Sequence, residues 1–208
     1  MAIVNKATPA DVKALVDIFY SGFNDEFFEP LFPQSRECRE FLEEAYGSWI
    51  KGKEGRQEAM VYVVRDEDGK TLSVASYWVI KPGDNGLQGW RSRWPAVPPG
   101  MSTEGLEEFF AGMESQHELG MGTKEHIYLE ILATQESARR RGYGSMLLDI
   151  GKELADGMDY PLYLDAERDS KSLYIKAGYQ ELTDIAQSSP LSPLMRLRKS
   201  EREAEEEI

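Results

Sequence analysis

The sequence is poor in the residues that form disulfides and metal sites. It has one cysteine, Cys38, and two histidines among 208 residues. A single cysteine cannot form an internal disulfide framework, and so few nitrogen and sulfur ligands argue against zinc, so we expect no metal. Cys38 falls in a helical pattern and is better explained as a small apolar core residue than as a nucleophile.

Long hydrophobic runs are also missing. No apolar run approaches the roughly 20 residues that a membrane-spanning helix needs. The first residues, MAIVNKATPADV, lack the positively charged segment and apolar stretch of a secretory signal. We therefore expect a cytoplasmic protein without a membrane partner.

Positive charge is scarce, with 24 Lys and Arg against 37 Asp and Glu, a net charge of −13. Non-specific nucleic-acid binding depends on Lys and Arg neutralising phosphates, so nucleic acid is not expected as a partner. The balance favours a cationic small molecule or basic peptide, although it could serve solubility alone. We predict one domain over residues 1–199, followed by an acidic, disordered tail over 200–208.

The N-terminal part predicts two helices and a hairpin. Thr8 and Pro9 have the residue types preferred at a helix N-cap and first helical position. Asp68-Gly69 between two β-rich runs is a hairpin signal. We predict a strand over 2–6, a helix from Thr8-Pro9 onward, a helix over 35–50, strands over 59–66 and 71–80, and a helix over 103–117.

Two loops in this part are rich in aromatic residues and proline. Residues 24–34 are expected to lie on the core or over a site. Residues 81–100 are unusually long for a connection in a compact domain, which indicates function or disorder. Their Trp90 and Trp94 fit two alternatives that stay open here: a lid over an acceptor site, where the rings could hold a cation, or a surface loop pinned by its tryptophans.

The C-terminal part alternates strands and helices. Residues 126–134 predict a central strand because both faces are apolar, with Ile127, Leu129, Ile131 and Ala133 on one face and Tyr128, Glu130 and Leu132 on the other. A glycine loop and a helix closed by Gly157 follow, then a strand at 161–166, a short helix ending at Gly178 and a strand at 194–199. This order predicts a mixed α/β sheet with a crossover helix.

The segment Arg139-Arg140-Arg141-Gly142-Tyr143-Gly144 lies between that strand and that helix. Its glycines allow successive main-chain N–H groups to point into one concavity, and the helix N-terminus adds further N–H groups. Cations are unfavourable at this end of a helix unless an anion lies between them, so a bound anion explains them better than a solvated turn. The spacing matches neither the P-loop nor Gly-x-Gly-x-x-Gly. An unrelated protein that binds ATP or a sugar phosphate here remains one hypothesis.

Arg139-x-x-Gly142-x-Gly144 resembles the pyrophosphate signature of the GNAT superfamily of N-acetyltransferases, and residues 128–148, 163–166 and 173–179 resemble members common in fungi. The resemblance implies an α/β (α+β) fold: a mixed, mostly antiparallel sheet of about six or seven strands, flanked by about four to five helices and splayed at the acyl-CoA site. It implies acetyl transfer from acetyl-CoA to an amine of a small molecule or peptide in a ternary complex, by a monomer or homodimer. The alternative is a catalytically idle CoA-binding sensor or partner module.

The same resemblance assigns the coenzyme site. Main-chain groups of the glycine loop would hold the diphosphate, those of the preceding strand would pair with the pantetheine arm, and Ser170 would join the site. The residues so assigned are Leu132, Ala133, Thr134, Arg139, Arg140, Arg141, Gly142, Tyr143, Gly144, Ser145 and Ser170.

Acetyl transfer needs a neutral amine and therefore a proton acceptor. Glu130, a carboxylate in an otherwise apolar strand, is our candidate for the catalytic base; a structural pairing with an arginine or main-chain amide is the alternative. Tyr128 on the same face, or water, could serve instead. By the resemblance, Tyr174 protonates the leaving thiolate. His117 and His126 are expected to be structural.

Overall fold

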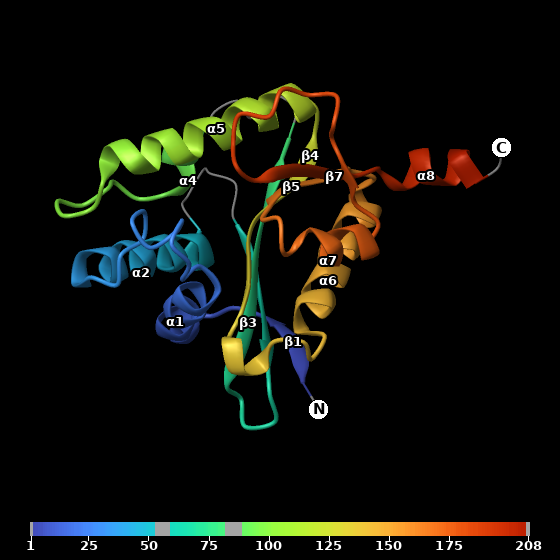
Figure 1. The fold of residues 1–208 in the computed structure, drawn as a ribbon. Helices are drawn as coiled ribbons and strands as arrows, with labels where there is room; N and C mark the ends of the chain where they lie inside the picture. Colours follow the sequence, from blue (N-terminus) through green and yellow to red (C-terminus); the bar gives the residue numbers. More distant parts are fainter. Residues whose placement is uncertain (1, 53–58, 82–88, 207–208) are drawn as a thin grey trace.

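The computed structural model describes residues 2–52, 59–81 and 89–206 (Figure 1). The strands are β1 (Ile3–Lys6), β2 (Met60–Arg65), β3 (Thr71–Ile80), β4 (His126–Thr134), β5 (Leu162–Ala166), β6 (Gln180–Glu181) and β7 (Ser192–Arg196). The helices are α1 (Val12–Gly22), α2 (Arg36–Lys51), α4 (Trp90–Arg93), α5 (Thr103–Met121), α6 (Tyr143–Met158), α7 (Lys171–Lys176) and α8 (Lys199–Glu206), with 3₁₀ turns at Pro9–Asp11 and Glu136–Ala138.

The strands form one sheet in the order β1-β2-β3-β4-β5-β7-β6. All neighbouring pairs are antiparallel except β4 and β5, which α6 connects as the crossover that a parallel pair requires. This confirms the predicted mixed, mostly antiparallel sheet. The described residues contain seven α-helical segments rather than four to five, because α4 is too short to leave a periodic pattern and α8 lies in the expected tail.

The sheet carries helices on both faces. Figure 1 shows α1 and α2 on one side and α6 on the other. On the first side, α1 packs against β3 and β4, and the apolar stripe predicted for α2 is buried in the same hydrophobic cluster. On the second side, α6 packs against β2, β3 and β4 in a separate cluster. The sheet therefore separates two cores.

The start of α1 is joined to the sheet by the carboxylate of Asp11. The main-chain N–H of Thr8 donates to it at 2.7 Å, as does the guanidinium of Arg65 at 2.6 Å and the hydroxyl of Thr71 at 2.9 Å. Although burial alone would raise it, these hydrogen bonds hold the pKa of Asp11 below its usual value. The predicted N-terminal cap is thus also a tertiary contact.

Strand β4 does not alternate along its whole length as the sequence predicts. Leu129 pairs with Tyr77 and Ile131 with Ser76, so Glu130 is an extra residue, a β-bulge. Ile127 and Leu129 pack in the α6 cluster, whereas Ile131 lies in the α1 cluster. The prediction that Ile127, Leu129, Ile131 and Ala133 share one face is therefore wrong, because the bulge moves the last two to the other face.

The C-terminal end of α6 also differs from the prediction. The helix continues past Gly157 to Met158, and Asp159 takes the left-handed conformation at its end, with φ of 53°. The carboxylate of Asp159 accepts hydrogen bonds from the main chain and hydroxyl of Ser200 at 2.9 and 2.7 Å. Residues 199–206 form helix α8 instead of the predicted disordered tail, and Arg202 in this helix pairs with Asp156 of α6 at 2.6 Å.

Part of the long loop at 81–100, residues 82–88, lies outside the described residues. The remainder includes α4, whose tryptophans are buried as in the pinned-loop alternative. Trp90 stacks on Phe110 with ring centroids 4.6 Å apart, and Trp94 stacks on Phe41 at 5.7 Å. Within the part of the chain that the structure describes, no helix combines the length and apolar character needed to cross a membrane.

Candidate active site

A cavity of about 580 Å³ opens where β4 and β5 separate. Among the described residues these strands pair only at Ile127 with Leu162 and at Tyr128 with Tyr163. Beyond that point β4 keeps its partner β3 on one side and has no paired strand on the other. Leu129 to Thr134 of β4 and Leu164 and Asp165 of β5, which lie beyond the last pair, line the cavity, so the sheet is splayed at this site.

Nearly all residues assigned to the coenzyme site line this one cavity. They are Leu132, Ala133, Thr134, Arg139, Arg140, Gly142, Tyr143, Gly144, Ser145 and Ser170. Arg141 does not line it; its guanidinium lies over the ring of Tyr143, 5.3 Å from the centroid. The structure therefore brings together residues that lie up to 38 positions apart in the sequence, from Leu132 to Ser170.

The glycine loop has the geometry of an anion-binding turn. Arg140 and Gly142 both adopt left-handed conformations, with φ of 59° and 84°, and Gly142 is the N-cap of α6. The N–H of Met146 closes the first turn by donating to the oxygen of Gly142 at 3.0 Å. The N–H groups before it in that turn have no helical acceptor and lie where the helix dipole favours an anion. A diphosphate would satisfy them.

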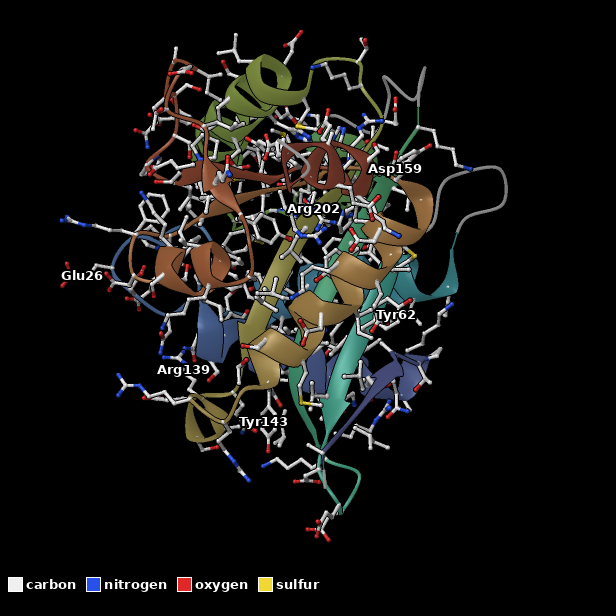
Figure 2. The ribbon with its side chains drawn as sticks, turned by 90° about the vertical axis from the view of Figure 1, so that its right-hand side faces the viewer. Glu26, Tyr62, Arg139, Tyr143, Asp159 and Arg202 are labelled. Atoms are coloured by element: carbon white, nitrogen blue, oxygen red, sulfur yellow. The ribbon has the colours of Figure 1, made fainter. Side chains whose placement is uncertain are left out.

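The side chain of Arg139 binds the protein's own main chain and does not extend into the cavity as a free cation. Its guanidinium donates to the main-chain oxygens of Ser21 and Thr134, the latter at 3.4 Å. The main-chain N–H of Glu136 donates to the hydroxyl of Ser21 at 2.8 Å. These bonds tie the end of α1 to the loop; Figure 2 shows Arg139 and Tyr143 near one end of α6 and Asp159 near the other.

The unpaired edge of β4 is suited to an extended ligand. Ala133 pairs with Val74 of β3, and its oxygen also accepts a hydrogen bond from the Ser73 hydroxyl at 2.8 Å. Leu132 to Thr134 line the cavity along this edge, where an amide-containing arm can pair with the strand as in strand addition. This geometry fits the predicted pantetheine position.

Tyr174 lies on α7 and lines the cavity with only 8% of its surface exposed. Burial, together with the charge of Glu167, raises the pKa of its hydroxyl well above the usual value for tyrosine. The phenol therefore remains protonated across the working pH range. It can donate a proton or a hydrogen bond to a leaving group in the cavity.

Glu130 lines the cavity but is engaged in the structural pairing that was the alternative to catalysis. One carboxylate oxygen lies 2.6 Å from Nε of Arg93, and the other accepts from the indole of Trp94 at 2.7 Å. The Arg93 and Glu130 side chains are both almost fully buried, at 2% and 3% exposure. The Arg93 guanidinium also lies over the ring of Tyr128, 5.2 Å from its centroid.

Asp165 of β5 is a lining residue that our sequence analysis missed. One of its oxygens accepts from the Gln116 amide and from the Tyr163 hydroxyl, the latter at 3.0 Å, while the other is buried and has no partner within the part of the chain that the structure describes. Burial is the main reason that its pKa rises to about 7. Its signal, a carboxylate in an apolar strand, is the one that identified Glu130.

Aromatic side chains form a further part of the lining, and the sequence pointed to only some of them, namely Trp94, Tyr128 and the loop at 24–34. They come from α1, the following loop, α4's C-terminal flank, α5 and β4: Phe19, Phe23, Phe28, Phe32, Trp94, Phe109, Phe110 and Tyr128. The loop at 24–34 thus lies over the site, as expected. The cavity has a polar part built from the glycine loop and an apolar part built from these rings.

The two histidines form a buried pair beside the cavity. Nδ1 of His126 lies 2.7 Å from the oxygen of Lys124, so this nitrogen carries the proton in the neutral ring. Its Nε2 then accepts from Nε2–H of His117 at 2.6 Å. Burial lowers the pKa of both rings, which favours the neutral pair. His117 also stacks on Tyr163 at 4.4 Å. This matches the expected structural role.

The splayed sheet, the glycine loop and the buried tyrosine together define an acyltransferase class of site. The model of the acetyltransferase (GNAT) family matches residues 13–179, most of the chain. The chain therefore belongs to the GNAT acetyltransferase family, and it is an acyltransferase. A search of curated proteins found no match.

Solved structures share this fold. An acetyltransferase of Corynebacterium glutamicum described as histone acetyltransferase HPA2 and related acetyltransferase is 24% identical, with a TM-score of 0.59 over 95% of this chain and 96% of that one. Arylalkylamine N-acetyltransferase 2 from Aedes aegypti is 13% identical, with a TM-score of 0.66 over 94% and 98%. The PaiA N-acetyltransferase of Thermoplasma acidophilum in complex with coenzyme A is 11% identical, with a TM-score of 0.59 over 95% and 99%. At these identities the likeness shows the fold alone.

Proposed function

We propose that the protein transfers an acetyl group from acetyl-CoA to an amine, in a ternary complex and without a covalent enzyme intermediate. The observation that supports this best is the shared cavity, which joins the glycine loop, the unpaired edge of β4 and Tyr174. The loop and strand edge offer main-chain donors and acceptors to the coenzyme. Tyr174 offers a proton to the sulfur that leaves.

The apolar part of the cavity favours an acceptor with an aromatic or aliphatic body. Phe23, Phe28 and Phe109 line it beside a carboxylate, Asp165, which suits an amine carried on an apolar group. The net charge of −13 supports attraction of a cation over a longer range. The Aedes aegypti enzyme with this fold is named for arylalkylamines, which are amines of this chemical kind. A small apolar amine is therefore our proposed acceptor.

Ligand binding tests the coenzyme part of the proposal. Acetyl-CoA and CoA should each raise the melting temperature, because a ligand at 100 times its Kd stabilises the folded state by about 2.7 kcal/mol. Calorimetry should show direct heat of binding for both. Stabilisation by ATP alone would contradict the proposal and favour a different phosphate-binding function.

Turnover separates the enzyme from the idle CoA-binding module. Thiol release from acetyl-CoA should accelerate on addition of phenylethylamine or hexylamine, with spermidine and a lysine peptide as polar comparisons. Coenzyme binding without thiol release for any amine would favour the idle module. Assignment to the fungal-type subgroup, the cytoplasmic location and the monomer or homodimer stay predictions.

A further inference from the structure

The opening between β4 and β5 has one carboxylate on each side. Tyr128 and Tyr163 form the last pair of the two strands, and Glu130 and Asp165 lie two positions beyond that pair on β4 and β5. Both residues line the cavity. Both carboxylates therefore lie at the opening of the sheet, and the two differ in what their oxygens already bind.

Glu130 has no oxygen free of a hydrogen bond. Arg93, which is permanently protonated, donates to one oxygen, and the Trp94 indole donates to the other. Loss of the negative charge of Glu130 would weaken its pairing with the buried Arg93 cation, at a high cost. Its contacts suit a carboxylate that holds α4 and Trp94 against β4.

Asp165 has the opposite arrangement. Both of its hydrogen bonds, from Gln116 and Tyr163, come from neutral donors and reach the same oxygen. The second oxygen is buried and has no partner among the described residues. An unpaired, desolvated carboxylate oxygen gains a hydrogen bond when a proton or an ammonium group reaches it.

Resting on the proposed function, we infer that Asp165, rather than Glu130, accepts the proton of the acceptor's ammonium group, and that the acceptor is an apolar primary amine lying among the aromatic rings. The carboxylate of Asp165 takes one proton from R–NH₃⁺. The free nitrogen lone pair then forms a bond to the thioester carbonyl carbon. The C–S bond breaks, with its electron pair leaving on sulfur.

The remaining protons balance through Tyr174 and water. Tyr174 gives its hydroxyl proton to the thiolate, and the second proton lost from nitrogen restores the phenol through water. The proton on Asp165 passes to solvent, so one proton is released for each amide and thiol formed. This sequence requires no further reactant.

The groups around Asp165 set the pH at which it works. Burial raises its pKa, hydrogen bonds from Gln116 of α5 and Tyr163 of β5 lower it, the Arg93 charge lowers it, and the Glu130 charge raises it, with a result of about 7. His117 on α5 is held neutral beside Tyr163. A base of this strength is ionised in half of the molecules near neutral pH, close to the optimum for general base catalysis.

The pH dependence of kcat/KM with phenylethylamine tests the inference. The wild-type enzyme should lose activity below about pH 7, as Asp165 becomes protonated. Asp165→Asn should lower kcat/KM at pH 7 by about 10²-fold or more and remove this acidic limb, with unchanged acetyl-CoA affinity by calorimetry. Glu130→Gln should retain the limb even if it is less stable.

Tyr163→Phe provides a matched variant, because it keeps the buried ring and removes one hydrogen bond to Asp165. That hydrogen bond lowers the pKa of Asp165, so its loss should move the acidic limb to higher pH. A structural role for Asp165 would not produce this shift.

Retention of the limb and of activity within threefold in a folded Asp165→Asn variant would overturn the inference, as would loss of the limb in Glu130→Gln. Turnover of spermidine or the lysine peptide but not of the apolar amines would overturn its acceptor part. Absence of thiol release from the wild-type enzyme with every amine would count against the proposed function instead.

Discussion

Tyr174 and Glu130 both line the cavity, but they differ in what each can do with a proton. Tyr174 is buried among apolar neighbours and keeps its proton. Glu130 is held by two donors, one on each oxygen of its carboxylate. The residue type was sufficient to place both in the site. The role of each depends on partners that come from other parts of the chain.

Replacement of Tyr174 by phenylalanine should lower kcat by about 10²-fold, because the leaving thiolate loses its proton donor, while acetyl-CoA affinity stays unchanged. Steady-state kinetics measures kcat, and calorimetry measures the affinity for acetyl-CoA. Tyr179→Phe is the matched control: this neighbouring ring lies 6.0 Å from that of Tyr174, and its buried hydroxyl has no partner among residues 2–52, 59–81 and 89–206. Equal effects of the two substitutions would contradict the assigned role.

Replacement of Glu130 by glutamine should destabilise the fold by about 3 kcal/mol, since it leaves the buried Arg93 guanidinium without its counter-charge. Urea unfolding measures this. Glu40→Gln is the matched control, because it removes an ion pair with Arg36 that has similar geometry but lies in solvent. The side chain of Glu40 is 60% exposed and that of Arg36 is 83% exposed. That variant should unfold at nearly the wild-type urea concentration. A Glu130→Gln variant as stable as this control would show that the buried pair is dispensable.

At the scale of elements, the sequence predicted those segments whose signals are local. The N-cap type of Thr8 and the helical spacing of apolar residues in α1 and α2 are local signals, and the structure confirms these helices. The bulge at Glu130 leaves no such signal, because it is set by pairing with β3. Arg93 and Glu130 lie 37 positions apart in the sequence, so the periodicity of apolar residues could not predict their contact either. The coenzyme residues were found because they form one continuous motif.

Helix α6 packs against β3 through a close approach at Gly151. A Cβ atom there would lie 2.5 Å from the hydroxyl of Tyr77, which donates to the oxygen of Leu147 at 2.9 Å. Gly151→Ala should therefore destabilise the protein by about 1–3 kcal/mol despite the higher helix propensity of alanine.

Gly157 lies in the same helix with nothing within 4 Å of an added Cβ. Gly157→Ala should be neutral or stabilise by up to about 1 kcal/mol. Thermal unfolding of both variants compares the two sites. If both raised the melting temperature, the close packing against Tyr77 would be contradicted.

At the scale of the whole molecule, the two parts of the chain contribute different halves of the cavity. Residues before 114 supply most of the aromatic lining, and residues from 128 onward supply the coenzyme loop, the strand edge and Tyr174. The sheet joins both parts, so loss of either destroys the site. Stability of the entire fold is thus a condition for activity.

Asp11 links the first helix to the β2–β3 hairpin, so its ionisation should affect global stability. Its folded-state pKa is lowered, so its contribution is present above the unfolded pKa of about 3.9 and is lost as pH falls through the lower folded value. Wild-type stability should therefore decline between about pH 5 and the acid range. Asp11→Asn should show a shallower decline. Identical slopes for both proteins in pH-dependent unfolding would contradict the role of this carboxylate.

The extra residue in β4 has a consequence for how this strand tolerates change. Its first half, up to Leu129, and its second half, from Ile131, are out of phase by one position. Deleting Glu130 would restore simple alternation and turn Ile131 and Ala133 from the α1 core toward α6, while Leu132 would swing the opposite way. A single inserted residue therefore sets which side chains of the coenzyme-facing half of β4 point to each face of the sheet. The number of residues in this strand is as constrained as their chemical type.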